Sequence, residues 1–561
     1  MSVATGPASI DELQRHLAAI TSEVRLSGTP EEARAFDYIA AQLASWGFTV
    51  NRYELDAFTG YPIKASLTMT SPERVSFPTN GYSLSPLTPD EGIEAEVVDA
   101  GSGSPAEFAA LDLAGKIVMT DGLATPGKAL AAAQAGAVGY IHVNGDRIYE
   151  MCISPVWGTP TPETADLLPS VPSVAVTTES ATKIREALKQ GPVRINLMTQ
   201  PYRGWSKLPV LTADLPGTEE DTYILFSGHV DSWHYGVMDN GTANATQLEV
   251  ARLISEQKGN LRRGLRMAFW SGHSHARYAG STWYADTFFD DLATKCVCHV
   301  NIDSVGAKGA VMLEGAPTMA ETYAFAKRIL NAAGHELNYN RMSRSSDQSF
   351  WGHGIPSVLA ALSEQKPDNS PTSKAHATLF GGGGLGWWWH TPEDTADKID
   401  PDFLKRDADI YFDTVLALVS EERLPFEPAA GLREIAAALT GYTEAAAGAL
   451  DLSDLSVAAN ALADRAEAAK VAALPAATAN QLIADLNRVI IPVNFTETGP
   501  YDHDLALGTQ PVHGLRESGQ LATLDAESTE YRFLRTKLVR ERNRVSGALR
   551  QVDALLTSAG L

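Results

Sequence analysis

The sequence predicts an α/β fold in which a mostly parallel, twisted sheet is flanked by helices. Between residues 205 and 425, apolar strand segments alternate with helical segments, and several strands are apolar on both faces, as in YILFSGHVDS and CVCHVNIDSV. Strands of this kind are buried on both sides, and regular alternation with helices is typical of parallel sheets. A β-rich stretch before this region and an Ala-rich helical stretch after it predict two further domains.

The N-terminal segment is predicted to form helices and then a strand. TPEE at residues 29–32 supplies an N-cap, a proline at the first helical position and acids in the first turn. This helix should run to about Trp46 and end at Gly47, and the alternating segment FTVNRYEL should form a strand.

The chain is divided by composition into three parts. Short strands such as GKIVMTD and GYIHV, separated by turns and one Ala-rich helix, predict an inserted β-rich module over residues 61–199. Residues 1–60 and 200–425 are assigned to the core, and residues 426–561 to a helical domain. One apolar stripe runs along the last helix, and it either packs within its own bundle or contacts a second copy; it consists of Leu534, Leu538, Val545, Leu549, Val552 and Leu556.

Composition limits the classes of partner. The net charge of −23 argues against nucleic acid or an anionic membrane, because binding phosphate requires concentrated Lys and Arg. Three cysteines give no disulfide framework, and Cys296 and Cys298 are expected to be unpaired strand thiols. We expect no leader peptide and no transmembrane helix, and therefore a cytoplasmic protein.

Polar residues with metal chemistry follow several predicted strands. His229 and Asp231 lie two apart at a strand end, and Asp239 follows after a short loop. Asp303 and His390 come at the ends of other segments of the core, so all these side chains should meet at one edge of the sheet. Mixed His and carboxylate ligands suit zinc, and manganese or iron less specifically.

These stretches resemble the M28 family of metallopeptidases, and the architecture resembles its glutamate carboxypeptidase II and transferrin receptor branch. The matching segments include SGHVDSWHYGVMDNGTANA, NIDSVG, SDQSFWGHGIPSV and WWWHTPEDTADKID. The insert resembles the protease-associated domain of that branch, with LAGKIVMTDG and LPSVPSVAVT as markers, and the C-terminal region takes the place of its dimerisation domain. The resemblance therefore implies a homodimer.

The resemblance also implies roles for single residues. His229, Asp239 and Asp303 would hold one metal ion, and Asp239 would bridge to a second ion that His390 also binds. Asp231 would fix the orientation of His229. Asp347 would lie near the substrate pocket.

The segment FWSGHSHARYAGS departs from the family pattern, which has two consecutive glutamates there: a general base and a metal ligand. Aligned on Gly280, Ser274 replaces the base and His275 the ligand; aligned on Trp270, His273 replaces the base and Ser274 the ligand. Imidazole is a good metal ligand and a serine hydroxyl a poor one. We therefore expect His275 on a metal and His273 near the proton transfer.

The expected reaction is metal-assisted hydrolysis of an amide in a peptide or small aminoacyl compound, with one or two divalent ions. Trp233 and Tyr235, which follow the first ligands, are expected to line the substrate pocket. Loss of the glutamate base leaves two alternatives open: a metal-dependent lyase that eliminates or cleaves a C–N bond, and a catalytically inactive binding or dimerisation protein.

Overall fold

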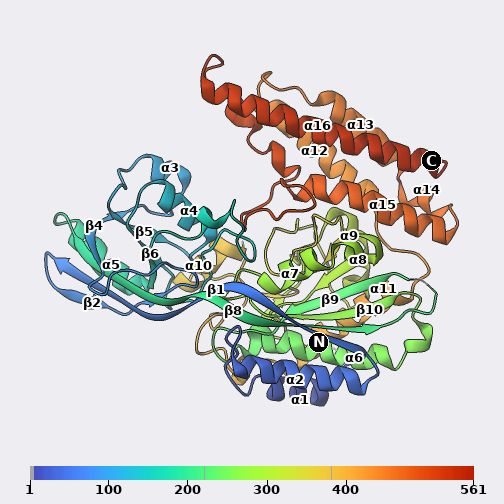
Figure 1. Ribbon diagram of the computed structural model, residues 1–561, viewed down its shortest axis with the longest axis horizontal. Helices are drawn as coiled ribbons and strands as arrows, with labels where there is room; N and C mark the ends of the chain where they lie inside the picture. Colours follow the sequence, from blue (N-terminus) through green and yellow to red (C-terminus); the bar gives the residue numbers. More distant parts are fainter. Residues whose placement is uncertain (1–5, 220, 381) are drawn as a thin grey trace.

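The computed structural model describes residues 6–219, 221–380 and 382–561. Residues 1–5, the start of the segment in which the sequence predicts no leader, lie outside the described residues. One long sheet runs through an α/β core and a β-rich insert, and a helical domain lies over the core (Figure 1). Within the described ranges, no helix combines the length and apolar character that crossing a membrane requires.

The N-terminal helices confirm the capping signals. Helix α1 (Ile10–Ile20) precedes α2 (Pro30–Ser45), whose N-cap Thr29 accepts a hydrogen bond from the Glu32 N–H. The helix ends before Gly47, whose φ of +89° is a conformation that favours glycine. Both helices pack beside α6 (Ala243–Ser255) under one face of the core sheet (Figure 1).

The core sheet is mostly parallel, as predicted. Strands β13, β11, β9 and β10 are parallel neighbours in that order, and β8 adds to β10 in the antiparallel direction. Side chains of β9 alternate between two apolar clusters: Phe226 packs toward α6, whereas Leu225 packs toward α7 and α8 on the other face. The bounds are β8 (Arg194–Leu215), β9 (Tyr223–His229), β10 (Gly264–Trp270), β11 (Cys296–Asn301), β13 (Ser357–Val358), α7 (Ala279–Thr287) and α8 (Phe289–Lys295).

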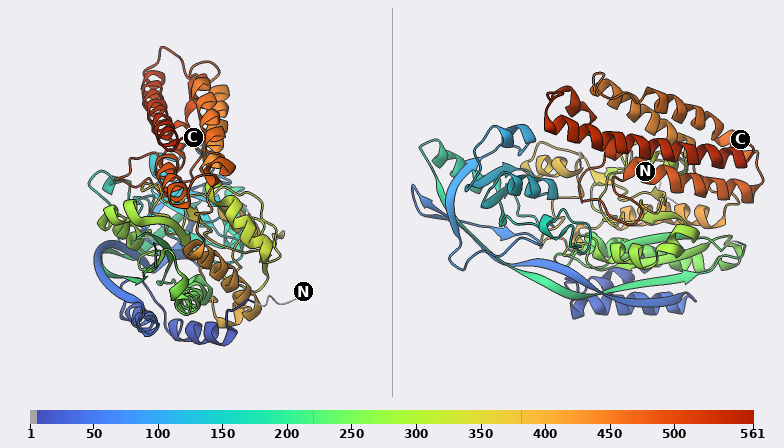
Figure 2. Two further views of the ribbon diagram at one scale, coloured as in Figure 1. Left: turned by 90° about the vertical axis from the view of Figure 1, so that its right-hand side faces the viewer. Right: turned by 45° about the horizontal axis from the view of Figure 1, so that its top comes forward.

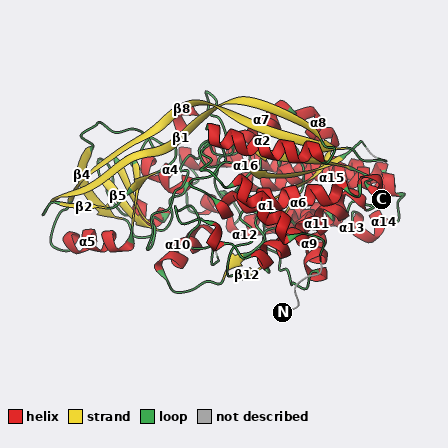
Figure 3. Cartoon of the chain, turned by 90° about the horizontal axis from the view of Figure 1, so that it is seen from below, coloured by secondary structure: helices red, strands yellow, loops and turns green. Residues whose placement is uncertain are grey.

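The insert continues the same sheet. Strands β1 (Thr49–Ser71) and β8 form a long antiparallel pair that runs from the core into the insert (Figure 3). There β8 pairs with β4, and β4, β5, β6 and β7 are parallel neighbours. The remaining bounds in the insert are β2 (Val75–Phe77), β3 (Asn80–Gly81), β4 (Ile93–Asp99), β5 (Ile117–Asp121), β6 (Gly139–Val143), β7 (Ser173–Val176), α3 (Pro105–Ala109), α4 (Pro126–Gln134) and α5 (Thr178–Leu188).

The C-terminal region is helical and lies over the core (Figure 2). Within the predicted stripe of α16 (Thr529–Ser558), five residues from Leu538 to Leu556 are buried and Leu534 is partly buried, so the stripe packs within its own bundle. The other helices of this region are α12 (Pro428–Ala445), α13 (Ser453–Arg465), α14 (Ala468–Ala472) and α15 (Ala476–Phe495). The core is completed by α9 (Ala320–Ala332), α10 (Pro371–Phe380), α11 (Pro401–Ser420), β12 (Ala310–Met312) and β14 (Glu364–Gln365).

The cysteines are unpaired, as predicted. Cys296 and Cys298 are buried in β11, and Cys152 is buried in the insert; all are free thiols. Burial raises the pKa of Cys296 to about 12, so this thiol stays protonated and packs as an apolar side chain.

Candidate functional site

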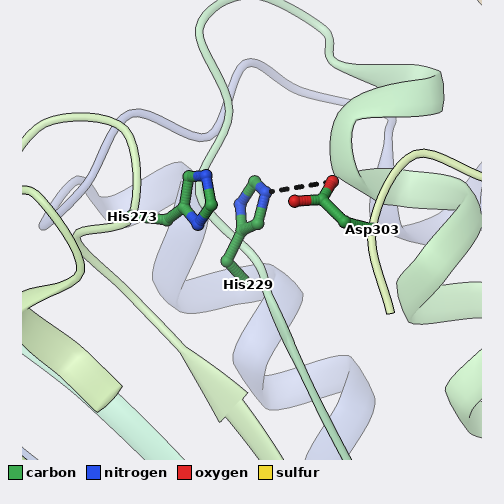
Figure 4. Close-up of side chains that lie close together, drawn as sticks. All are labelled: His229, His273 and Asp303. Carbon is green, nitrogen blue, oxygen red and sulfur yellow. Dashed lines mark ion pairs between the residues drawn. The ribbon is translucent and has the colours of Figure 1, made fainter. Parts of the chain in front are cut away.

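The candidate site lies at the carboxyl ends of the central parallel strands. His229 is the last residue of β9, the segment with His273 follows β10, and Asp303 comes two residues after β11. Figure 4 shows the side chains of these three residues together. Among the described residues, their ligand atoms form a group in which all lie within 4.8 Å of one another. The edge of the sheet therefore gathers residues from three strands, as the sequence predicts.

Asp239 lies between two histidines. Its Oδ1 is 3.1 Å from His229 Nε2 and its Oδ2 is 2.8 Å from His390 Nε2. The backbone N–H of Asp239 donates to the Asp394 carboxylate at 3.0 Å, which fixes the loop before α6. One carboxylate thus faces both imidazoles, which is the arrangement expected of a bridging ligand.

Each of these histidines is oriented by a backbone carbonyl. His229 Nδ1 donates to the carbonyl of Asp231 at 2.9 Å, and His390 Nδ1 donates to the carbonyl of Glu150 at 2.6 Å. The ring of His390 also stacks on Trp389, with centroids 3.5 Å apart. Because Nδ1 donates in both rings, Nε2 is the nitrogen left to bind a metal or a proton.

The carboxylate of Asp231 has a different role from the predicted one. Its Oδ1 is 3.7 Å from His229 Nδ1, too long for a hydrogen bond. It accepts instead from the backbone N–H groups of His273 (3.2 Å) and Ser274 (2.9 Å), and from Ser27 Oγ (2.8 Å). Asp231 therefore orients His229 through its main chain, while its side chain fixes the loop that follows β10.

The electrostatics of the site favour a cation. Burial would lower the pKa of His229, but contacts with Asp231, Asp239 and Asp303 outweigh it and raise the pKa well above the usual value. Burial would raise the pKa of Asp239, but hydrogen bonds from His229 and His390 hold it well below the usual value. A field that favours a proton on a buried imidazole also favours a metal ion there. The donor set of imidazoles and carboxylates therefore fits a divalent ion such as zinc.

His273 lies beside the ligands and is held by Asp347. Its Nδ1 is 2.9 Å from Asp347 Oδ2, and its ring stacks on that of His229 at 3.7 Å with an angle of 14° between the planes. Because the two ring planes are nearly parallel and separated, the in-plane lone pairs of the two rings cannot meet at one ion about 2.1 Å from each nitrogen. Proton transfer through Nε2 fits this geometry better than binding the same ion as His229.

His275 lies outside the close group of ligand atoms, as Asp239 and His390 do, and is held by Ser27. The close group of ligand atoms among the described residues contains His273 and not His275. Ser27 N–H points at His275 Nδ1 (3.3 Å), and Ser27 Oγ lies 2.8 Å away. Burial lowers the pKa of His275 to about 4, so the ring is neutral, and its Nε2 is buried without a hydrogen-bond partner among the described residues. Contacts with Ser27 involve Nδ1 and leave Nε2 without a partner, so the role of His275 as a metal ligand stays a prediction.

Of the other predicted site residues, Ser274 and Trp233 are buried and Tyr235 is exposed. Ser274 is buried, and its Oγ has no hydrogen-bond partner among the described residues. Trp233 is buried between two imidazoles, with ring centroids 4.6 Å from His275 and 5.4 Å from His390. Tyr235 is 46% exposed and belongs to the surface of the same loop. Trp233 thus forms a wall of the site, whereas Tyr235 lies outside the packed part.

The site also depends on residues that carry no sequence signal of their own. The fully buried Arg25 donates to the carbonyls of Val230 (2.9 Å), Tyr235 (2.8 Å) and Gly236 (3.0 Å), and so shapes the loop between His229 and Asp239. Asp394 follows His390 by four positions in the segment WWWHTPEDTADKID, which is the one clue that could have found it.

The insert contacts the loop after β10, which contains the segment that departs from the family pattern. Arg277 Nε donates to the Ser154 carbonyl at 3.0 Å, its Nη2 donates to the Cys152 carbonyl, and its own carbonyl accepts from Gly158 N–H at 2.6 Å. Arg277 has a φ of +44° and Tyr278 a φ of +69°, a conformation that non-glycine residues adopt only when their surroundings fix it. The Tyr278 ring in turn meets the His273 ring edge-on at 4.8 Å.

Two parts of the chain match the models of known protein families. Residues 211–415 match the model of peptidase family M28, and residues 88–184 match that of the PA domain. The chain is 24% identical over 365 residues to the probable glutamate carboxypeptidase VP8 of Zea mays, covering 53% of this chain and 50% of that protein. It is 24% identical over 233 residues to carboxypeptidase Q of Xenopus laevis, covering 39% of this chain and 49% of that protein. It thus spans about half the length of these curated relatives.

Solved structures share the fold. The aminopeptidase from Aneurinibacillus sp. strain AM-1 superposes with a TM-score of 0.55 and 22% identity, over 74% of this chain and 94% of that one. A zinc aminopeptidase from Bacillus subtilis superposes with a TM-score of 0.54 and 20% identity, over 75% of this chain and 98% of that one. At these identities the likeness establishes the fold alone.

Proposed function

The chain is a peptidase family M28-like protein that carries a PA domain, and we propose that it is a metal-dependent hydrolase. Its substrate is an amide bond in a peptide or a small aminoacyl compound. The observation that carries this proposal is the pair of His273 and Asp347, 2.9 Å apart beside His229. It offers a proton acceptor where the family pattern has a glutamate.

Four residues would hold the metal. His229, Asp239 and Asp303 form one set of donors, and Asp239 with His390 forms a second, so these residues could hold one or two ions. Zinc suits these donors best, and manganese or iron also fits them. When bound, the metal supplies Lewis acidity, which polarises a substrate carbonyl and makes water more acidic.

The residues of the chain would carry the proton. His273 Nε2 takes a proton from the attacking water while Asp347 accepts the hydrogen bond from Nδ1 and stabilises the imidazolium that forms. The same Nε2 then gives the proton to the leaving amine, so that water is added across the amide bond and the ring returns to its starting state. Asp231 fixes the backbone of His273 and thus its distance from the ligands.

The relatives support the hydrolytic reaction over the alternatives. The matched proteins are named as carboxypeptidases, and the superposed structures as aminopeptidases, one of them a zinc enzyme. Four ligand positions in this chain keep the residue types that the resemblance requires. A carboxylate-supported histidine in reach of the site gives a route for the proton that an inactive binding protein would not need.

The test compares zinc-loaded wild type with two variants on a panel of dipeptides and aminoacyl anilides. We expect labelled oxygen from water in the carboxyl product. His273→Ala should lower kcat by about 100- to 10,000-fold with metal content unchanged. His229→Ala should lose both metal and activity.

Three results would contradict the proposal. A product without labelled oxygen would indicate a lyase, and a wild-type protein that binds no stoichiometric metal would indicate a binding protein. Loss of metal in His273→Ala would show that His273 is a ligand and not the base.

A further inference from the structure

A buried tryptophan of the insert, Trp157, packs against the core beside the candidate site. It is 3% exposed. Its ring contacts the Tyr278 ring, with centroids 4.3 Å apart, and the Arg344 guanidinium lies over it, 4.1 Å from its centroid. A ring packed in this way has little freedom to rotate, so the direction of its indole N–H is fixed.

A chain of hydrogen bonds leads from this N–H to Asp347. Trp157 Nε1 donates to Ser349 Oγ at 2.9 Å, and Ser349 Oγ lies 2.9 Å from Ser281 Oγ. Ser281 Oγ in turn donates to Asp347 Oδ1 at 2.7 Å. None of the four residues is more than 3% exposed, so the whole chain is shielded from solvent.

The direction of donation along the chain follows from its two ends. The indole N–H of Trp157 can only donate, and the carboxylate of Asp347 accepts. Ser281 has one proton, and Asp347 is nearer to it than its other acceptor, the Tyr278 carbonyl at 3.2 Å. Ser349 therefore donates to Ser281. Each hydroxyl accepts one hydrogen bond and donates the next in the same direction, and bonds arranged in this way strengthen one another.

The chain ends on the carboxylate that holds His273. Asp347 Oδ1 accepts from Ser281, and Oδ2 is paired with His273 Nδ1 at 2.9 Å. With a separate partner for each oxygen, the plane of the carboxylate is fixed, and with it the direction of the contact to His273.

We propose that Trp157 is a positioning residue of the reaction: through Ser349 and Ser281 it holds the Asp347 carboxylate in the plane that directs His273 toward the metal ligands. This rests on the proposed function, and it gives the insert a part in the proton transfer. Catalysis is sensitive to displacements of about 1 Å, so loss of one distant hydrogen bond can lower the rate without changing the ligands.

The experiment removes the indole N–H and keeps an aromatic ring. Zinc-loaded, full-length Trp157→Phe is compared with wild type on the panel of dipeptides and aminoacyl anilides. We expect kcat to fall about 3- to 10-fold, the effect of one neutral hydrogen bond, with KM and metal content unchanged.

Trp351→Phe is the matched control. Trp351 is also buried, and its Nε1 donates to Ser357 Oγ at 3.1 Å, but Ser357 donates to Gln348 and not to Asp347. This variant loses the same kind of bond and the same ring volume in the same segment as Asp347. Its kcat should stay near the wild-type value.

A double-mutant cycle tests whether Trp157 acts through the chain. Ser349→Ala breaks the chain one bond further on, so Trp157→Phe combined with it should lose no more than the larger single loss. In Asp347→Asn, Trp157→Phe should have no further effect. Losses that add in either background, or an unchanged kcat in Trp157→Phe alone, would overturn the proposal.

A measurement without turnover separates this proposal from the proposed hydrolase. In protein with isotope-labelled histidine, the nuclear magnetic resonance signal of His273 Nδ1–H is assigned by its absence in His273→Ala. It should shift in Trp157→Phe and stay in place in Trp351→Phe. A shift without any hydrolysis would keep the chain and refute the hydrolase. Hydrolysis with neither a shift nor a loss of kcat would refute the role of Trp157 alone.

Discussion

Glu150 and His390 are joined by two hydrogen bonds, one from the His390 side chain and one between their main chains, although 240 residues separate them in the sequence. His390 Nδ1 donates to the Glu150 carbonyl at 2.6 Å, and the Glu150 N–H donates to the His390 carbonyl at 3.1 Å. His390 has a φ of +58°, and this reciprocal pair, with the stacked Trp389, fixes a backbone conformation that is unfavourable on its own. The insert thus orients a candidate metal ligand of the core.

Metal removal should therefore destabilise the protein. Chelation of the zinc-loaded protein should lower the melting temperature by on the order of 5 °C, because an ion that binds only the folded state adds to its stability. His390→Ala should reduce both the bound metal, measured by atomic absorption, and this shift. His335→Ala is the control, because His335 lies just after α9 and its charged neighbours among the described residues are Arg406 and Asp407 rather than the ligands. An unchanged shift in His390→Ala would refute its role as a ligand.

Asp347→Asn should lower kcat by about 100-fold or more, because the amide cannot stabilise a positively charged His273. Metal content should not change, since Asp347 contacts His273 and not the ligands. The control is Ser281→Ala, which removes the other hydrogen bond to Asp347 (2.7 Å to Oδ1) and leaves the His273 contact in place. Steady-state kinetics should show a much smaller loss for it. Equal losses in the two variants would indicate that Asp347 is only structural.

Arg277→Lys should lower kcat by about 10- to 100-fold with KM and metal content nearly unchanged. Lysine cannot donate to both the Ser154 and Cys152 carbonyls, so the loop would shift and displace His273, and catalysis is sensitive to displacements of about 1 Å. Arg185→Lys is the matched control in the insert, where Arg185 pairs with Asp99 and Asp121. A parallel fall in metal content would show that Arg277 acts on the ligands and not on the base.

Glu321→Gln should stabilise the protein at alkaline pH. Burial raises the pKa of Glu321, at the start of α9 against Gly431, to about 7 from 4.5. The folded state therefore keeps a proton that the unfolded state loses, and stability falls as the pH rises from about 4.5 to 7. The full loss is about 3 kcal/mol. Thermal unfolding should show a higher melting temperature for the variant at pH 8 and little difference at pH 4.5.

The exposed Glu73, on the turn between β1 and β2, serves as the control for this pH dependence. Glu73→Gln should change the melting temperature by the same small amount at both pH values. A Glu321→Gln variant that gains no stability at pH 8 would contradict this prediction, and would mean that the charge of Arg341 offsets the cost of burying the ionised Glu321 carboxylate.

Much of the core was predictable because its signals are local. Thr29 and Gly47 bound α2, and the strands that carry His229 and Asp303 are apolar on both faces, so residues at their ends meet by the rules of parallel sheets. The separate places of His273 and His275 were not predictable. They depend on the turn of the loop after β10 and on Ser27, which lies 248 residues away in the sequence.

Contacts between the insert and the core could also not be predicted from the sequence. Glu150 and Arg277 belong to no sequence motif, and their importance comes from backbone groups that folding brings to them. The homodimer and the cytoplasmic location stay predictions.

The paired strands β1 and β8 limit where the chain can be cut to separate the insert from the core. The expected boundary near residue 60 falls inside the pair, where Gly60 is opposite Arg203, and the expected boundary near residue 200 is opposite Lys64. Removing the insert as a cassette would cut two strands in mid-length and leave unpaired edges, which invite aggregation. A shortened protein would have to keep matched lengths of both strands and replace the backbone partners of His390 and Arg277. The insert therefore continues the core sheet and cannot be treated as a separable module.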